Sequence, residues 1–133
     1  MGQLINLKCS KCGYETNLGI GSGLTYNDLE KVLSFFDNAT KDNIRKVVSE
    51  GSNKLWYVYK EIARCEKCGK ISAIAVFKTT APDGREITYH AKCQCGSNDI
   101  ELFDSEKIID GKATIACPIC GDNLEVTVQG HWD

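Results

Sequence analysis

All eight cysteines of the sequence fall into four short pairs, and each pair is followed directly by glycine. Two thiolates one or two residues apart can bind the same tetrahedral ion, with sulfur about 2.3 Å from the metal. The glycine permits the tight backbone turn that such a pair, a knuckle, requires. Two knuckles complete one four-thiolate site. The sequence therefore predicts two zinc ions, held by Cys9, Cys12, Cys65, Cys68, Cys93, Cys95, Cys117 and Cys120.

Disulfide bonds are the main alternative for a chain this rich in cysteine. A bridge inside a C-x-x-C pair closes a very small loop and adds little stability. The first seven residues are too short and too polar for the apolar core of a secretory signal. A redox dithiol uses one such motif rather than four. Spacing and context thus favour metal, and reduced thiols favour a cytoplasmic protein.

No residues predict catalysis. A four-thiolate zinc site is closed, whereas a catalytic zinc keeps one position for water. The sequence has no His-Glu-x-x-His or deaminase-type His-x-Glu motif. His90 and His131 are potential ligands, but eight cysteines already fill two sites, so we expect a surface or supporting role for both. We therefore predict that the protein is not an enzyme and has no catalytic or cofactor-binding residues besides the zinc ligands.

Hydrophobic periodicity predicts a small, metal-bound α+β fold, with zinc-ribbon β-hairpins and an inserted two-helix hairpin at about residues 25–50. The first helix should begin near Thr25, with Asp28 in its capping box and a core-facing apolar stripe behind it. The second should end at Gly51. Strands are expected to enter and leave each knuckle, and residues 105–111 are expected to form a loop.

Hairpins between knuckles allow two ways of pairing the four knuckles into two sites. In the sequential pairing, Cys9, Cys12, Cys65 and Cys68 hold one ion and the last four cysteines hold the other. In the nested pairing, Cys65/Cys68 joins Cys93/Cys95, and Cys9/Cys12 joins Cys117/Cys120. We favour the sequential pairing, which divides the chain into a lobe at 1–92, carrying the helical insertion, and a second ribbon at 93–133.

Charge is distributed unevenly along the 133 residues, whose formal net charge is −2. Eight thiolates and two zinc ions bring the holo protein to about −6, which disfavours non-specific nucleic-acid binding. Residues 1–92 carry 14 Lys and Arg against 10 Asp and Glu, whereas residues 93–133 carry 2 against 8. No apolar run is long enough to span a membrane.

The knuckles resemble those of the zinc-ribbon, or rubredoxin-like, families. Cys9-Ser10-Lys11-Cys12-Gly13-Tyr14 is similar to the first rubredoxin knuckle, and Cys117-Pro118-Ile119-Cys120-Gly121 to the second. The chain as a whole resembles small bacterial proteins with several ribbons and a tail like Gly130-His131-Trp132-Asp133. This resemblance implies the ribbon fold and zinc, but it does not specify a function.

Three functions fit these observations. The first is a non-catalytic adaptor that binds another protein through its acidic C-terminal ribbon and exposed strand edges. The second is nucleic-acid binding, as in transcription-related ribbons, through the basic residues of the first part: Lys8, Lys11, Lys54, Lys60, Arg64, Lys67 and Lys70. The third is electron transfer with iron in one site. We rank them in this order.

Overall fold

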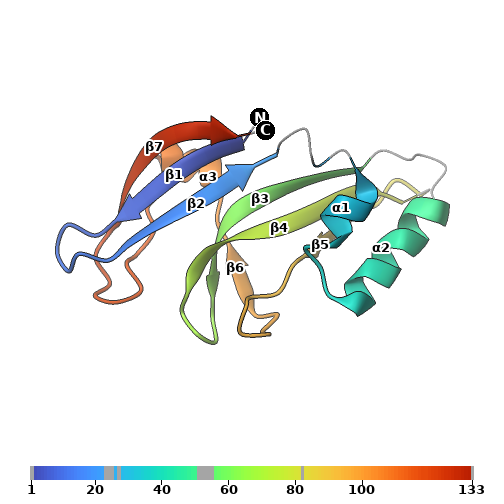
Figure 1. Ribbon diagram of the computed structural model, residues 1–133, viewed down its shortest axis with the longest axis horizontal. Coiled ribbons are helices and arrows are strands. Elements are labelled where there is room, and N and C mark those ends of the chain that lie inside the picture. The colour runs from blue at the N-terminus through green and yellow to red at the C-terminus, as the bar shows by residue number, and fades with distance from the viewer. Residues whose placement is uncertain (1, 23–25, 27, 51–55, 82, 133) are drawn as a thin grey trace.

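The computed structural model describes residues 2–22, 26, 28–50, 56–81 and 83–132. These residues form a small α+β fold in which an antiparallel sheet predominates (Figure 1). The strands are β1 (Gly2–Lys8), β2 (Glu15–Gly21), β3 (Trp56–Cys65), β4 (Ile71–Thr80), β5 (Glu86–His90), β6 (Ile100–Leu102) and β7 (Glu125–Trp132). The helices are α1 (Leu29–Leu33), α2 (Asn38–Glu50) and α3 (Ser105–Ile109).

The sheet runs in the order β5-β4-β3-β2-β1-β7, and β6 pairs with β3 beside this path. One group of strands consists of β2, β1 and β7, which pair along most of their lengths. A second consists of β3, β4 and β5. Within the described residues, the groups are joined in the sheet by one residue pair, Gly21 with Lys60. The two groups therefore diverge on one side of this junction (Figure 1).

The described residues form two apolar cores, one of which includes residues of both strand groups. Alternation along β1 places Ile5 and Leu7 on one face, where they are buried with Leu18 and Ile20 of β2. Ile62 of β3 and Ile71 of β4 belong to the same core. The other core lies between the helices and β3–β4 and contains Val32, Leu33, Phe36, Ile44, Val58 and Phe77. The predicted apolar stripe of the first helix is thus confirmed as a core face.

Several local predictions need correction. The helix α1 begins at Leu29, with Asp28 itself as the N-cap, because the Asp28 side chain accepts a hydrogen bond from the Glu30 amide. Thr25 and Gly51 lie outside the described residues. Residues 105–109 form α3 rather than a loop, because Asp104 caps a turn that buries Ile108.

Among the described residues, the expected pairing of residues 99–103 with residues 113–116 is also not found. β6 pairs with β3, and β7 pairs with β1, so neither pairs with residues 113–116. Residues 1–92 and 93–133 therefore both contribute strands to one sheet. The division at residue 92 remains a prediction about domains. No helix among the described residues combines the length and apolarity needed to cross a bilayer.

Candidate metal centres

All four knuckles share one backbone arrangement. In three of them the first cysteine donates its N–H to the carbonyl five residues on, with N–O distances of 2.8 Å for Cys9, 2.9 Å for Cys65 and 2.6 Å for Cys117. Cys93 reaches the carbonyl four residues on, at 3.0 Å, because its knuckle is one residue shorter. The glycine after each second cysteine donates back to the carbonyl of the first. This turn aims both sulfurs to the same side.

The knuckle glycines are required by backbone conformation rather than by lack of space. Gly13, Gly69, Gly96 and Gly121 have φ angles between 77° and 90°, which L-residues with a Cβ rarely adopt. A Cβ built on any of these four would meet no atom within 4 Å. The predicted role of these glycines as turn formers is therefore confirmed.

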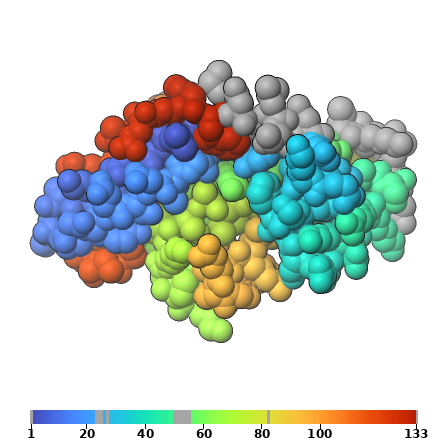
Figure 2. All heavy atoms as spheres, in the orientation of Figure 1, coloured from blue at the N-terminus to red at the C-terminus, as the bar shows by residue number. Residues whose placement is uncertain are grey.

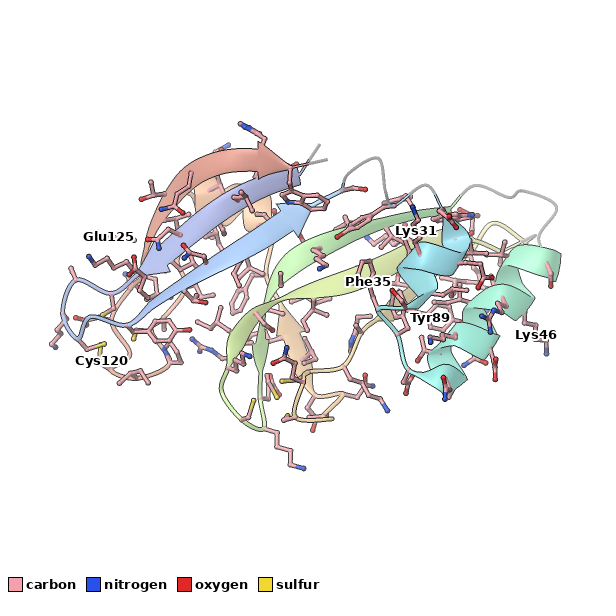
Figure 3. The ribbon with its side chains drawn as sticks, in the orientation of Figure 1. Lys31, Phe35, Lys46, Tyr89, Cys120 and Glu125 are labelled. Atoms are coloured by element: carbon pink, nitrogen blue, oxygen red, sulfur yellow. The ribbon has the colours of Figure 1, made fainter. Side chains whose placement is uncertain are left out.

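The eight sulfurs come together in two groups of four. The terminal cysteine group consists of Cys9, Cys12, Cys117 and Cys120, and the central cysteine group consists of Cys65, Cys68, Cys93 and Cys95. Within each group all sulfurs lie within 4.8 Å of one another, an arrangement that can hold a metal ion. All eight cysteines are free thiols. Figure 3 labels Cys120 of the terminal cysteine group, which lies beyond the ends of β1 and β2.

The spacing of the sulfurs fits a tetrahedral metal. Four sulfurs about 2.3 Å from one ion stand about 3.8 Å from each other. The Cys9–Cys120 and Cys12–Cys117 sulfurs are 3.4 and 3.5 Å apart. The Cys65–Cys95 and Cys68–Cys93 sulfurs are each 3.6 Å apart. The donor set and the geometry therefore suit a structural zinc site in both groups.

The nested pairing is the one that the fold produces, so our preference for the sequential pairing was wrong. β1 and β7 are antiparallel and pair Lys8 with Glu125, which places the knuckle after β1 next to the knuckle before β7. Likewise, Cys65 at the end of β3 pairs with Ile100 of β6, and the Glu66 amide donates to the Asp99 carbonyl. This pairing brings the β3–β4 turn next to the knuckle that precedes β6.

Each group has an inner and an outer half. The first cysteine of every knuckle is buried, at no more than 4% exposure, and the second is exposed. Backbone amides support two of the inner sulfurs, because Cys68 donates to the Cys65 sulfur and Ile119 to the Cys117 sulfur, each at 3.4 Å. An ion here would be held from the protein side and shielded from water by four ligands.

The thiol pKa values in each group spread apart. The Cys68 amide, opposed by burial and aided by the Lys67 amide, lowers the pKa of Cys65 to about 6. For Cys93, a hydrogen bond from the Cys95 amide lowers the pKa, but burial and the neighbouring sulfurs outweigh it and raise the pKa to about 12. Cys65 thus ionises readily and Cys93 resists ionisation, because a second negative charge would lie beside the first. A divalent cation relieves this repulsion, so metal binding must release protons.

Arg64 links the two groups, a role that its position before Cys65 did not reveal. Its guanidinium Nη2 donates to the carbonyl of Ala116, the residue before Cys117. Its Nε is buried and has no hydrogen-bond partner among the described residues. A zinc ion with four thiolates carries a net charge of −2, so Arg64 would supply a countercharge from the surrounding shell.

The other predicted residues lie apart from the sulfurs. Both groups contain cysteines only, and His90 and His131 belong to neither. The ring Nδ1 of His90 lies 3.0 Å from the Ala91 carbonyl, and His131 lies on β7. The predicted basic residues do not all face one way. Lys11 pairs with Asp122 at 3.7 Å, Arg64 points inward, and Lys54 lies outside the described residues.

A scan against models of protein families, a search of curated proteins and a search of solved structures each found no match. The fold class and the two cysteine groups thus define this chain as a small α+β protein with two four-thiol sites that can hold metal ions.

Proposed function

We propose that this chain is a non-catalytic zinc protein of the cytoplasm, in which two structural four-thiolate sites fasten a scaffold that binds another protein. The observation that carries the proposal is the gathering of all eight cysteine sulfurs into two groups with tetrahedral spacing. Four protein ligands leave no coordination position for a substrate or a water, which argues against catalysis at the metal.

The strand arrangement around the sulfurs supports zinc ribbons as the local architecture. The terminal cysteine group lies at one end of the three strands β2, β1 and β7. The central cysteine group lies at the turn of the β3–β4 hairpin, with β6 alongside. These arrangements support the resemblance of the knuckles to zinc-ribbon families, in which a short hairpin or three-stranded sheet carries the metal at one end.

Metal analysis tests the proposal directly. The protein, purified under reducing conditions, should contain two zinc ions per chain and be colourless. All eight thiols should resist alkylation until a chelator is added, because the ligands are metal-bound thiolates. Red colour and iron in the purified protein would instead support the electron-transfer alternative. A metal-free protein with eight reactive thiols would refute both.

Nucleic-acid binding is our second proposal. Lys60 and Lys70 favour it, because neither has a carboxylate within ion-pair distance among the described residues. The formal net charge of −2 disfavours it, since affinity for phosphate backbones depends on cationic charge. Titration with mixed-sequence single-stranded and duplex oligonucleotides distinguishes this function from the adaptor function. A nucleic-acid-binding protein should bind them at about 50 mM salt and lose affinity as salt rises.

A further inference from the structure

A groove crosses the sheet where the two strand groups diverge. It consists of two adjoining cavities of about 380 and 150 Å³, which share Lys60 and Ala73 in their linings. The larger lies against β2 and Trp132, and the smaller lies against Phe35. Small side chains, those of Ala73, Ala75 and Ala91, leave the space open. In Figure 2 the surface of β3 and β4 is visible between that of β1–β2 and that of the helices.

Three aromatic rings form one wall of this groove. The ring centroids of Trp132 and Tyr26 are 5.2 Å apart, and those of Tyr26 and Phe35 are 5.3 Å apart in an edge-on contact. Phe35, labelled in Figure 3, lies between α1 and the sheet. Tyr26 is only 8% exposed, so its ring packs against its neighbours and has no exposed face on which a base could stack. The wall therefore suits aliphatic side chains better than nucleobases.

The groove also presents positive charge and an unused donor. The Lys60 ammonium lies 4.7 Å from the centroid of the Phe35 ring. Lys70 donates to the Gln94 amide oxygen, whereas Lys92 is neutralised by Asp37 at 2.8 Å. The Nε1–H of Trp132 is buried and has no acceptor in the described part of the chain. An occupant of this groove must therefore bring negative charge to match Lys60.

The edge of β2 offers backbone pairing in the same place. Apart from Gly21, the residues of β2 have no strand partner on the β3 side within the described residues. Asn17, Leu18 and Gly19 of this edge line the larger cavity. An extended peptide can satisfy such an edge by adding a strand, with its main chain supplying affinity and its side chains supplying specificity.

We propose that this groove binds an extended acidic segment of a partner protein, with a carboxylate at Lys60, aliphatic side chains against Trp132 and main-chain pairing to β2. This inference rests on the proposed adaptor function and assigns its docking site. It replaces the acidic C-terminal ribbon as the docking surface. Nucleic acid is disfavoured here because the rings pack against one another and the protein carries net negative charge.

The test selects binders from a random dodecapeptide phage library on zinc-loaded protein and then titrates synthetic copies of the enriched peptides. Enriched peptides should be acidic with interspersed aliphatic residues, and their charge-reversed versions should bind at least about tenfold more weakly. In ¹⁵N spectra the indole N–H signal of Trp132 should move on binding. The signal of Trp56 should stay, and a Trp56→Phe variant assigns the two.

Lys60→Glu and Lys46→Glu form a matched pair, because each reverses one lysine and only Lys60 lines the groove. Lys46 lies on α2 on the side away from the sheet, as labelled in Figure 3. The first change should weaken peptide binding about tenfold or more, and the second should change it less than about twofold. Zinc content is measured in every sample. A wild-type protein without metal would refute the proposed function, whereas a zinc-loaded Lys60→Glu variant that fails to bind peptide reports on the groove alone.

Three outcomes would overturn the inference while zinc remains bound. They are no enrichment of acidic peptides, binding indifferent to Lys60→Glu, and a Trp132 indole signal that does not respond. Binding of a single-stranded oligonucleotide that depends on Lys60 and moves the same indole signal would also overturn it, in favour of nucleic acid.

Discussion

The terminal and central cysteine groups present the same four thiols but close very different lengths of chain. Cys12 and Cys117 are 105 residues apart, whereas Cys68 and Cys93 are 25 apart. Closing a longer loop removes more freedom from the unfolded chain. The terminal cysteine group also belongs to an apolar core, since Cys9 and Cys117 pack with Ile5 and Leu7, whereas the central sulfurs lie in neither core cluster. The same ligand chemistry should therefore stabilise the fold to different degrees in the two places.

Acidification should have the largest effect, because it removes both ions at once. The pKa values of Cys65 and Cys117 are lowered to about 6 and about 7 from an ordinary 9.0. For Cys117 burial opposes this change, and the amides of Cys120 and Ile119 outweigh it. A lowered pKa means that stabilisation is present above the ordinary value and is lost as pH falls through the lowered one.

Because bound metal competes with protons for the thiolates, we expect zinc content to fall from two ions toward none only at a pH below these values, followed by unfolding. Metal analysis after gel filtration across a pH series, with circular dichroism on the same samples, measures this. Return to neutral pH with added zinc should restore the fold. A protein that keeps both ions and its structure in strong acid, where the thiolates are protonated, would contradict a thiolate site.

Cys117→Ser should have the next largest effect. It removes a ligand of the terminal cysteine group and places a hydroxyl in the core, so β7 should separate from β1. We expect one zinc ion per chain and rapid hydrogen exchange along both strands, but slow exchange in β3 and β4. Cys117→His is the control, because imidazole is also a zinc ligand and should restore part of the metal affinity. Equal exchange in wild type and Cys117→Ser would remove the distinction between the groups.

Cys68→Ser should act more locally, because Cys68 is an exposed ligand of the central cysteine group. Zinc content should fall to about one ion, and exchange should rise at the β3–β4 turn and in β6 while β1 and β7 stay protected. Hydrogen exchange with mass spectrometry compares this variant directly with Cys117→Ser. Retention of two ions would contradict the assignment of Cys68 as a ligand.

Arg64→Gln tests whether Arg64 contributes to the metal affinity of the terminal cysteine group. The variant removes the guanidinium that donates to the carbonyl of Ala116, the residue directly before Cys117. We expect two bound ions, with the affinity of the terminal cysteine group reduced about tenfold, as for other supporting residues around metal ligands. Competition with a chromogenic chelator measures it. Arg45→Gln on α2 is the matched control, since Arg45 is an exposed arginine that pairs with Glu30.

Asp37→Ala should have the smallest effect, because Asp37 lies in the helical part and touches neither group. Its carboxylate accepts hydrogen bonds from Lys92 and from the Thr40 amide, and these hold its pKa well below the ordinary value. At neutral pH, where the carboxylate is charged, the change should lower the unfolding midpoint by a few degrees and leave zinc content unaltered. Asp42→Ala, at an exposed site on α2, is the control for calorimetry.

The sequence by itself determined the features that depend on neighbouring residues. The spacing of Cys117 and Cys120 and the glycine after them define a knuckle, because the turn involves only a few adjacent dihedral angles. The apolar stripe through Val32 and Phe36 predicted a buried helix face for the same reason, since helical periodicity is local. The identity of the eight cysteines as one set was likewise apparent from their spacing alone.

Only the tertiary structure decided which knuckles meet. Cys9 faces Cys120 because β1 pairs with β7, and the register of a strand pair across more than 100 residues is set by burial rather than by spacing. The inward turn of Arg64 and the groove beside Lys60 arise in the same way, from strands that pair in one place and diverge in another. Local sequence therefore specifies which residues are ligands, whereas long-range packing specifies which ligands share a site.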